Sequence, residues 1–373
     1  MAHARSEAEC RRIRRQKTSV SQFETIKLIG KGAFGEVRLC RDLKNGDLVA
    51  LKVLLRRVVC KEVGQALLMR LLQVLDKDEM RRRNQVMNVR SERNLLAVAE
   101  SPWLVKLHCS FQDRDNLYFA MEYLPGGDFM TLLQVQYARL RMRQARQRAF
   151  YPDTFSLQRE DILTHNAAKF YTASLLLSLE VVHGLGYIHR DIKPDNLLIG
   201  SDGHLRLTDF GLCKPFDSSS FLVAASDDPS ASQTPAASAP GPSAAMKTTW
   251  NFKRRTLAYS SVGTPDYIAP EVLRKVGYGP EADLWGVGCV LFEMLCGFPP
   301  FFSDDAHTTC RKIVQWRSYL KFPTDVSIEP QAQSLIRQLL CDGGDRLTIA
   351  ACKVHPCARA HRRHFCVLCT CMN

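Results

Sequence analysis

The sequence has no apolar run long enough to cross a membrane, and its Arg-rich N-terminus lacks the apolar core of a signal peptide. No internal repeat is visible. Acidic residues are scarce, with 38 Asp and Glu against 51 Lys and Arg, a net charge of +13. Because a membrane-spanning run and a signal peptide are both missing, we expect a soluble protein, cytoplasmic or nuclear. The positive balance suits nucleic acid, an acidic membrane surface or an acidic partner, but also a basic enzyme with a solvated surface, which we favour.

The 14 cysteines are expected to remain free thiols, because a reducing compartment does not favour disulfides. The chain has 373 residues, 46% of them hydrophobic, so it can bury a large core. This predicts one two-lobed domain or two smaller ones.

The apolar pattern changes along the chain. Residues 23–54 form short β-rich runs broken by glycines, which predicts an antiparallel sheet with tight turns, the second at residues 44–47. Helical periodicity appears at residues 161–183 and 282–295. The sequence thus predicts an α+β fold with a β-rich first part and a helical second part.

Four segments do not fit this alternation. Residues 55–75 are compatible with an amphipathic helix, and residues 134–158 are strongly basic; each is either a docking or membrane-surface helix or, as we favour, a solvated insertion. The Ser/Ala/Pro-rich residues 217–246 are interpreted as a disordered insert. The tail, residues 351–373, is rich in Cys and His, and its single C-x-x-C at Cys366 is only a weak zinc signal.

A glycine loop at residues 30–37 reads G-x-G-x-x-G-x-V. Glycines allow backbone amides to approach phosphate oxygens. The loop lies between two β-rich runs, whereas a dinucleotide-binding fingerprint opens a helix, and no Gly-Lys-Ser/Thr of a P-loop follows. The nucleotide loop is predicted to comprise Ile29, Gly30, Lys31, Gly32, Ala33, Phe34, Gly35, Glu36 and Val37.

Lys52 ends the strand-like run Val-Ala-Leu-Lys downstream of this loop. A lone strand lysine is usually an exposed edge residue. Its position after the glycine loop instead favours an ammonium that reaches the α- and β-phosphates of ATP. Such a lysine needs an acidic partner, and Glu92, on a helical pattern, is the candidate.

Three further motifs follow in the order typical of phosphoryl transfer. His-Arg-Asp at residues 189–191 with Asn196 matches H-R-D-x-x-x-x-N, residues 209–211 match D-F-G, and residues 269–271 match A-P-E. Together with the glycine loop and the lysine, this order makes coincidence a poor explanation.

Phosphoryl transfer needs metal ligands, a phosphate-holding ammonium and a carboxylate that receives the hydroxyl proton. We therefore predict that Asp209 and Asn196 hold Mg²⁺, that Lys52 and Lys193 contact the phosphates of ATP, and that Asp191 receives the proton.

Residues 23–346 resemble the catalytic domain of eukaryotic protein kinases, and Lys193 in HRDIKPDN is the residue of the serine/threonine type. The AGC group, and within it the NDR/LATS family, is indicated by SFQDRDNLYFAMEYLPGGDFMTLL, TDFGLC, VGTPDYIAPEV, WNFKRRTLAYSSVGTPDY and AHARSEAECRRIRRQKTSVSQFETIKLIGKGAFGEVRL. The resemblance implies a bilobal kinase fold, with a basic regulatory helix at 1–22, a small β-rich lobe at 23–121 and a larger helical lobe at 122–350.

The same resemblance implies roles for single residues in nucleotide binding. Met121 is the gatekeeper, Ala50 borders the nucleotide, and Glu122 and Leu124 offer backbone groups to adenine.

Regulation is implied as well. Ser260, or Ser261 beside it, matches the activation-segment phosphorylation site, whose phosphate would pair with Arg190. Residues 253–255 resemble the family's autoinhibitory basic stretch.

Two structural roles follow from the resemblance. Asp283 is expected to orient the catalytic loop, and Glu271 to pair with Arg346.

The resemblance further implies protein substrates with basic residues before the acceptor, read by Asp128, Asp195 and Glu293; the alternative is that these are ordinary surface carboxylates. It also implies a MOB-type adaptor, for which residues 11–17 are the binding candidate, and an upstream Ste-like kinase.

The chain departs from the family pattern in two respects. Lys52 and Glu92 are 40 residues apart, about twice the expected spacing, and no phosphorylatable hydrophobic motif follows Arg346. The alternative to an active kinase is therefore a catalytically weak or inactive kinase-fold scaffold. Nucleic-acid binding through the basic residues 139–148 is a weaker third hypothesis.

Overall fold

The computed structural model describes residues 18–32, 35–55, 88–113, 116–150, 162–216 and 265–358. The chain divides into two compact units. The first comprises the described residues up to Pro125 together with Thr208–Cys213, and the second comprises the remainder. The first unit is β-rich and the second is mainly helical, which is the expected α+β arrangement of a small and a larger lobe.

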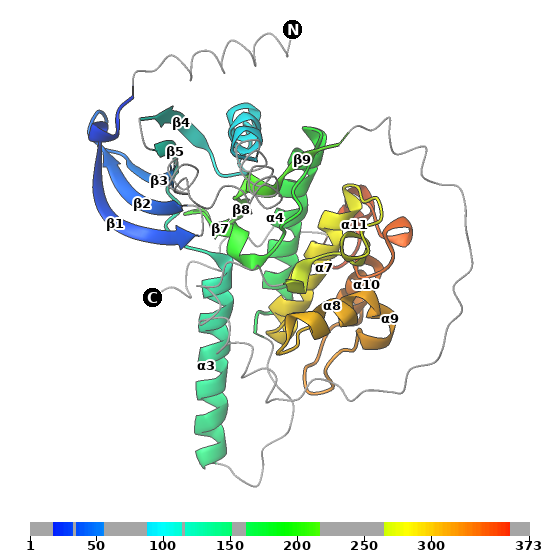
Figure 1. Ribbon diagram of the computed structural model, residues 1–373. Coiled ribbons are helices and arrows are strands. Elements are labelled where there is room, and N and C mark those ends of the chain that lie inside the picture. Colours follow the sequence, from blue (N-terminus) through cyan, green and yellow to red (C-terminus); the bar gives the residue numbers. More distant parts are fainter. Residues whose placement is uncertain are drawn as a thin grey trace, which may run out of the picture. The chain divides into compact units, whose positions relative to one another are not determined.

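A five-stranded antiparallel sheet is the main part of the first unit (blue to teal in Figure 1). Its strand order is β1-β2-β3-β5-β4. The strands are β1 (Phe23–Gly32), β2 (Gly35–Asp42), β3 (Leu48–Leu55), β4 (Leu107–Gln112) and β5 (Asn116–Glu122). A helix over residues 88–98 belongs to the same unit. The turn between β2 and β3 lies where the sequence predicts it, with Gly46 at a φ of 79°.

One face of this sheet carries the core of the first unit, because alternate residues of a strand point to the same side. The cluster comprises Phe23, Cys40, Val49, Leu51, Val53, Cys109, Tyr118 and Ala120. Phe111 stacks between Phe23 and Tyr118, with ring centroids 5.5 and 4.8 Å away. Lys52 alternates with Leu51 and Val53, so it points away from this core.

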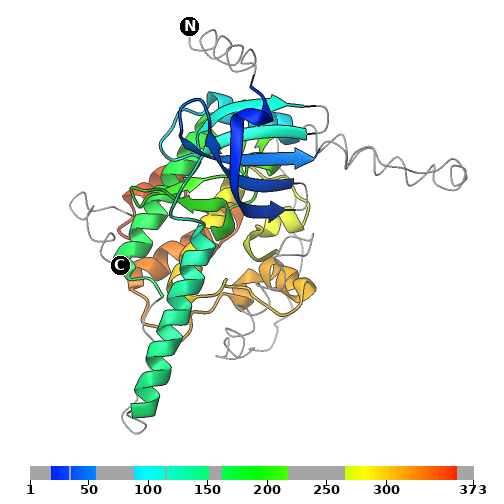
Figure 2. The same cartoon turned by 90° about the vertical axis from the view of Figure 1, so that its left-hand side faces the viewer.

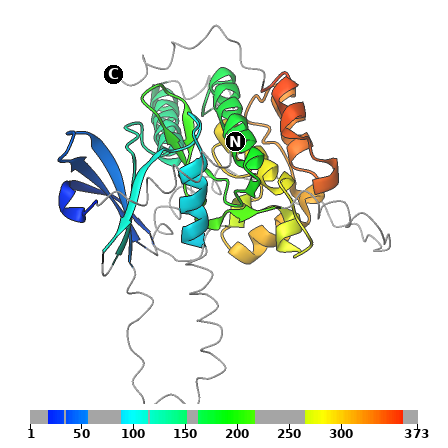
Figure 3. The same cartoon turned by 90° about the horizontal axis from the view of Figure 1, so that it is seen from above.

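The second unit is built around α7 (Glu281–Cys296), which is buried along almost its whole length. A helix that is apolar on every side needs neighbours on every side. α4 (His165–Gly184) and α10 (Pro330–Leu339) contact it, and Figure 3 shows α7 in yellow beside α4 in green. The remaining helices are α3 (Phe129–Phe150), α6 (Pro270–Leu273), α8 (Ala306–Val314), α9 (Trp316–Tyr319) and α11 (Ile349–Val354).

Two short antiparallel pairs complete the second unit. β6 (Tyr187–Ile188) pairs with β9 (Lys214–Pro215), and β7 (Leu197–Ile199) pairs with β8 (Leu205–Leu207). The catalytic-loop motif lies between β6 and β7 and includes a 3₁₀ turn at Pro194–Asn196. These pairs fix both ends of the loop.

Most of the basic segment at residues 134–158 belongs to α3. Tyr137 and Leu140 are buried, whereas Arg141, Met142 and Arg143 are exposed. Figure 2 shows the C-terminal part of α3 extending beyond the other helices of its unit. The first half of this segment therefore packs in the second unit, and the exposed arginines agree with the expectation of a solvated surface.

The other predicted inserts lie outside the described residues. These are residues 56–75, residues 217–246 and the tail beyond residue 358 with Cys366. Within the described part of the chain, all cysteines are free thiols, and His, Cys, Asp and Glu nowhere form a cluster of three suited to a metal ion. None of the helices in this part combines the length and apolarity needed to span a membrane.

Gly297 ends α7 at a φ of 82°, and a Cβ there would lie 2.0 Å from Cδ1 of Ile162. Gly186, at a φ of 78° in the same unit, has no atom within 4 Å of such a Cβ. We expect Gly186→Ala to lower the free energy of unfolding by about 1–2 kcal/mol through backbone strain alone. Gly297→Ala should lower the free energy of unfolding by about 1–3 kcal/mol more than Gly186→Ala, because its Cβ would also overlap with Ile162.

Urea unfolding of both variants measures this difference. Equal losses would mean that Ile162 moves aside without cost, contrary to our expectation.

Candidate active site

The glycine loop is the turn between β1 and β2. Gly30 pairs with Val37, and Gly32 pairs with Gly35. The glycines therefore lie in a β-hairpin and do not open a helix, which agrees with the sequence argument against a dinucleotide-binding fold. Ala33 and Phe34, at the tip of the loop, lie outside the described residues.

The residues predicted to surround adenine come together in the first unit. Ala50 on β3 is directly opposite Met121 on β5, and both are buried. Glu122 ends β5, and its backbone N–H donates to the carbonyl of Lys106 at 2.9 Å, so Glu122 can offer adenine only its carbonyl. Leu124 follows two residues later and is also buried.

Lys52 holds two carboxylates. Its Nζ donates to Oε1 of Glu92 at 2.6 Å and to Oδ1 of Asp209 at 3.2 Å. Glu92 lies on the helix over residues 88–98 with a side chain only 3% exposed. The pair that the sequence predicts is thus formed, despite the 40 residues between its members.

The electrostatics of this cluster favour a charged lysine. Burial alone lowers the pKa of Lys52, but the charges of Glu92 and Asp209 outweigh it and hold that pKa above its ordinary value. Burial raises the pKa of the Glu92 carboxyl, and the charge of Lys52 opposes this. The ammonium therefore keeps its proton across the neutral range.

Asp209 adopts a left-handed backbone with a φ of 61°, which is uncommon for a residue other than glycine. Its side chain is half exposed although it also touches Lys52. Carboxylate and amide oxygens are ligands that Mg²⁺ accepts. Asp209 and Asn196 thus fit the predicted metal role by chemical type.

The catalytic loop collects its polar groups around Asp191. Oδ2 of Asp191 accepts from Nζ of Lys193 at 2.6 Å and from Nδ2 of Asn196 at 2.8 Å. Nδ2 of Asn196 also donates to the Asp191 carbonyl at 2.8 Å. The three residues of the H-R-D-x-K-x-x-N pattern therefore form one bonded group in the second unit.

Asp283 on α7 binds the backbone of the catalytic loop, as expected from the resemblance. Its carboxylate accepts from the backbone N–H groups of His189 and Arg190 at 2.8 and 2.7 Å. It also lies 2.8 Å from Nε2 of His183 near the end of α4. The sequence analysis missed His183, and a histidine closing the helical pattern just before the loop was the only available signal.

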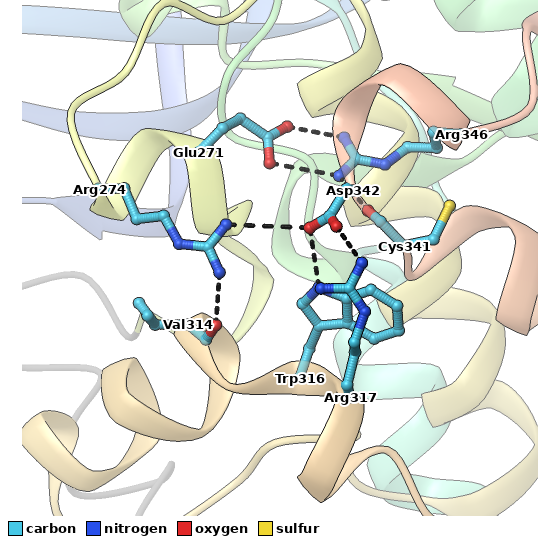
Figure 4. Close-up of polar contacts among 8 residues, drawn as sticks. All are labelled: Glu271, Arg274, Val314, Trp316, Arg317, Cys341, Asp342 and Arg346. Atoms are coloured by element: carbon cyan, nitrogen blue, oxygen red, sulfur yellow. Dashed lines mark hydrogen bonds and ion pairs between the residues drawn. The ribbon is translucent and has the colours of Figure 1, made fainter. Parts of the chain in front are cut away.

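The predicted pair of Glu271 and Arg346 is present and bidentate (Figure 4). The nitrogen–oxygen distances are 2.7 and 3.3 Å. Arg346 also donates to the carbonyls of Glu281 and Cys341. It therefore ties α6, α7 and the loop before α11 together.

The three carboxylates predicted to bind basic residues of the substrate differ in their surroundings. Asp128 accepts from the backbone N–H and hydroxyl of Thr131 at 2.7 and 2.8 Å, so it caps the start of α3. Glu293 is only 1% exposed and accepts from the Tyr267 hydroxyl, so it is not an ordinary surface carboxylate. Asp195 is exposed.

The regulatory residues lie outside the described part of the chain. These are Ser260, Ser261, residues 253–255 and the adaptor candidate at residues 11–17. Their predicted roles stay predictions.

Comparison with known proteins matches residues 23–358 to the protein kinase domain. The chain is 41% identical over 353 residues to serine/threonine-protein kinase CBK1 of Pneumocystis carinii, covering 91% of this chain and 61% of that protein. It is 39% identical over 350 residues to serine/threonine-protein kinase tricornered of Drosophila pseudoobscura pseudoobscura, covering 93% and 67%. It is 39% identical over 345 residues to serine/threonine-protein kinase sax-1 of Caenorhabditis elegans, and this match covers 92% of this chain and 63% of that protein.

This chain thus spans about two thirds of the length of these relatives. The match to the kinase domain covers the glycine loop, Lys52, the catalytic loop and both later motifs. The chain therefore belongs to the protein kinase family and, within its AGC group, to the NDR/LATS kinases.

Proposed function

We propose that this protein is a serine/threonine protein kinase that transfers the γ-phosphoryl group of ATP to serine or threonine hydroxyls of proteins. The observation that carries the proposal is the ammonium of Lys52, held at 2.6 Å by Glu92 and at 3.2 Å by Asp209. In this reaction class the lysine and its helix glutamate must be paired for the phosphates to be positioned. The scaffold alternative has no comparable support.

Asp191 is the proposed acceptor of the substrate hydroxyl proton. Its carboxylate is oriented by Lys193 and Asn196, and its backbone by the hydrogen bonds that the N–H groups of the two preceding residues donate to Asp283. A base held at several points stays in the geometry that the reaction needs. Lys193 is placed beside this carboxylate, where its charge can act on the γ-phosphate.

Asp209 and Asn196 would hold Mg²⁺, which, when bound, neutralises charge on the phosphate oxygens. Both supply oxygen ligands suited to a hard cation. Lys52 and the glycine loop would hold the remaining phosphates. Adenine would meet Ala50, Met121 and the backbone of Glu122 and Leu124.

The substrates proposed are proteins with basic residues ahead of the acceptor, which the exposed Asp195 and the half-buried Asp128 can attract, whereas Glu293 is buried against Tyr267. A MOB-type adaptor at residues 11–17, an upstream Ste-like kinase and a cytoplasmic or nuclear location belong to the same proposal. They rest on the family resemblance. Phosphate on Ser260 would pair with Arg190, whose backbone Asp283 already holds.

Transfer of radiolabelled γ-phosphate from ATP to a basic serine peptide tests the reaction. We expect activity in the unmodified chain and a decrease in kcat of about 100-fold or more in Asp209→Asn, because the variant loses a charged metal ligand. Activity in neither protein, with ATP still bound, would overturn the proposal in favour of the scaffold.

Glu92→Gln tests the role of the ion pair. We expect kcat/KM to fall by about 10- to 100-fold, since Lys52 loses one of its two charged partners and keeps Asp209. Glu24→Gln is the control, because it removes an exposed carboxylate from β1 of the same unit. A similar loss in both variants would argue against a specific role for Glu92.

An unbiased peptide array tests the substrate preference. We expect Arg or Lys to be preferred before the acceptor, and this preference to weaken in Asp128→Asn. Asparagine still caps a helix, so α3 should remain stable while the negative charge is lost. An array without any basic preference in the unmodified chain would contradict the expected substrate class.

A further inference from the structure

The short helix α6 is followed by a turn in which one residue, Lys275, has an unfavourable backbone conformation. The backbone N–H of Lys275 donates to the carbonyl of Val272, and that of Val276 donates to Glu271. This is the pattern of a Schellman turn, in which glycine usually takes the left-handed position. Here Lys275 takes it, at a φ of 57°. A left-handed lysine costs about 1–2 kcal/mol, so the turn needs support from elsewhere.

A cluster around Asp342 supplies that support from outside α6 (Figure 4). Arg274, the last residue before the left-handed lysine, donates from Nη2 to the carbonyl of Val314 at 2.6 Å. Its Nη1 lies 3.8 Å from Oδ1 of Asp342. The guanidinium is thus fixed between the end of α8 and the loop after α10.

Asp342 is itself held by two further donors from α9. Nε1 of Trp316 donates to Oδ1 at 3.1 Å, and Arg317 donates to Oδ2. The Arg317 guanidinium lies over the Trp316 ring, 4.7 Å from its centroid. Indole, guanidinium and carboxylate therefore fix one another. The Asp342 cluster, comprising Arg274, Trp316, Arg317 and Asp342, joins three segments that are distant in the sequence.

A residue shortly after this turn contacts the catalytic loop. Tyr278 lies three residues after Lys275, and the guanidinium of Arg190 lies over its ring, 5.6 Å from the centroid. Arg190 precedes Asp191 and also has a left-handed backbone, with a φ of 72°. The residue after Tyr278 is also held in place, because the backbone N–H of Gly279 donates to the carboxylate of Glu281 at 2.6 Å.

We propose that Asp342 is a positioning residue for the catalytic loop, acting through Arg274, the turn after α6 and the ring of Tyr278 on Arg190. The proposal rests on the proposed kinase function for its kinetic consequences. Asp342 touches neither substrate nor reacting atoms; it keeps the Tyr278 ring where it supports Arg190.

The size of the effect is limited by exposure. The side chains of Arg274 and Asp342 are 40% and 34% exposed, so water screens their attraction. The backbone of Arg190 is also held independently by Asp283. Small misplacements of catalytic groups nevertheless have large kinetic effects, and we expect Asp342→Ala to lower kcat by about 5- to 10-fold without changing the KM for ATP.

Steady-state kinetics of ATP and a basic serine peptide test the proposal in three variants. Arg274→Ala should reproduce the loss seen in Asp342→Ala, and the double variant should be no worse than either, because both act through one contact. Adding Lys275→Gly to Asp342→Ala should restore part of kcat, since glycine accepts the left-handed turn without support. Losses that add in the double variant, or an unchanged kcat in Asp342→Ala, would overturn the proposal.

Glu180→Ala is the matched control. It breaks an exposed ion pair of the same unit, from Lys353 to Glu180 at 2.8 Å, that touches neither the turn nor the catalytic loop. Its kcat should equal that of the unmodified chain. A loss as large as that of Asp342→Ala would show a general effect of surface ion pairs and contradict the proposal.

Hydrogen exchange separates this proposal from the proposed function. In Asp342→Ala we expect faster exchange at residues 275–280 and at residues 187–193, and in Glu180→Ala at neither. Faster exchange at the turn alone would refute the coupling even if the kinase is active. Faster exchange at both segments in a chain without phosphotransfer would support the coupling while the proposed function fails.

Discussion

The second unit depends on one buried carboxylate, that of Asp283 on α7. It accepts two backbone N–H groups of the catalytic loop and meets His183 from α4. A buried carboxylate without such partners would be strongly unfavourable, so the loop and the helix require each other. Because the loop is bound through its backbone, its side chains remain available for chemistry. Arg190, Asp191 and Lys193 all extend from a main chain that α7 holds.

Other buried charges follow the same principle. Glu92 is compensated by Lys52, Glu271 by Arg346, and Glu293 by the Tyr267 hydroxyl. Each contact joins elements that are far apart in the sequence. Buried pairs of this kind are weak sources of net stability, and removing one partner is much more costly than never having the pair. A buried charge is left without its partner when the two elements separate, so each contact disfavours arrangements in which these elements do not meet.

The sequence predicted the elements and motifs well where the signal was local. The helix predicted at residues 161–183 begins at His165 because Thr164 caps it, and the one predicted at residues 282–295 agrees with α7 within one residue at each end. The glycine loop and the catalytic loop were recognisable because their residues are close together in the chain. Long-range pairs such as Glu271 with Arg346 required knowledge of the family pattern, since periodicity does not indicate which elements face one another.

The contacts that remained unpredicted are all tertiary. Nothing near Tyr278 in the sequence indicates that its ring meets Arg190, and Asp342 resembles any loop carboxylate. The left-handed backbone of Lys275 could not be foreseen either, because the usual signal for such a turn is a glycine at that position. Packing decides these features after the local elements have formed.

The burial of α7 on every side has a consequence for how the polypeptide reaches its native state. The residues from Ala282 to Cys296 are all buried in the folded unit. While the neighbouring helices are missing, this segment exposes apolar surface that can aggregate. α4 precedes α7 in the chain, but α10 is synthesised later, so a nascent chain that has just completed α7 leaves the side that α10 contacts uncovered. Until α10 has been translated, this apolar side of α7 is open to aggregation and to chaperone binding.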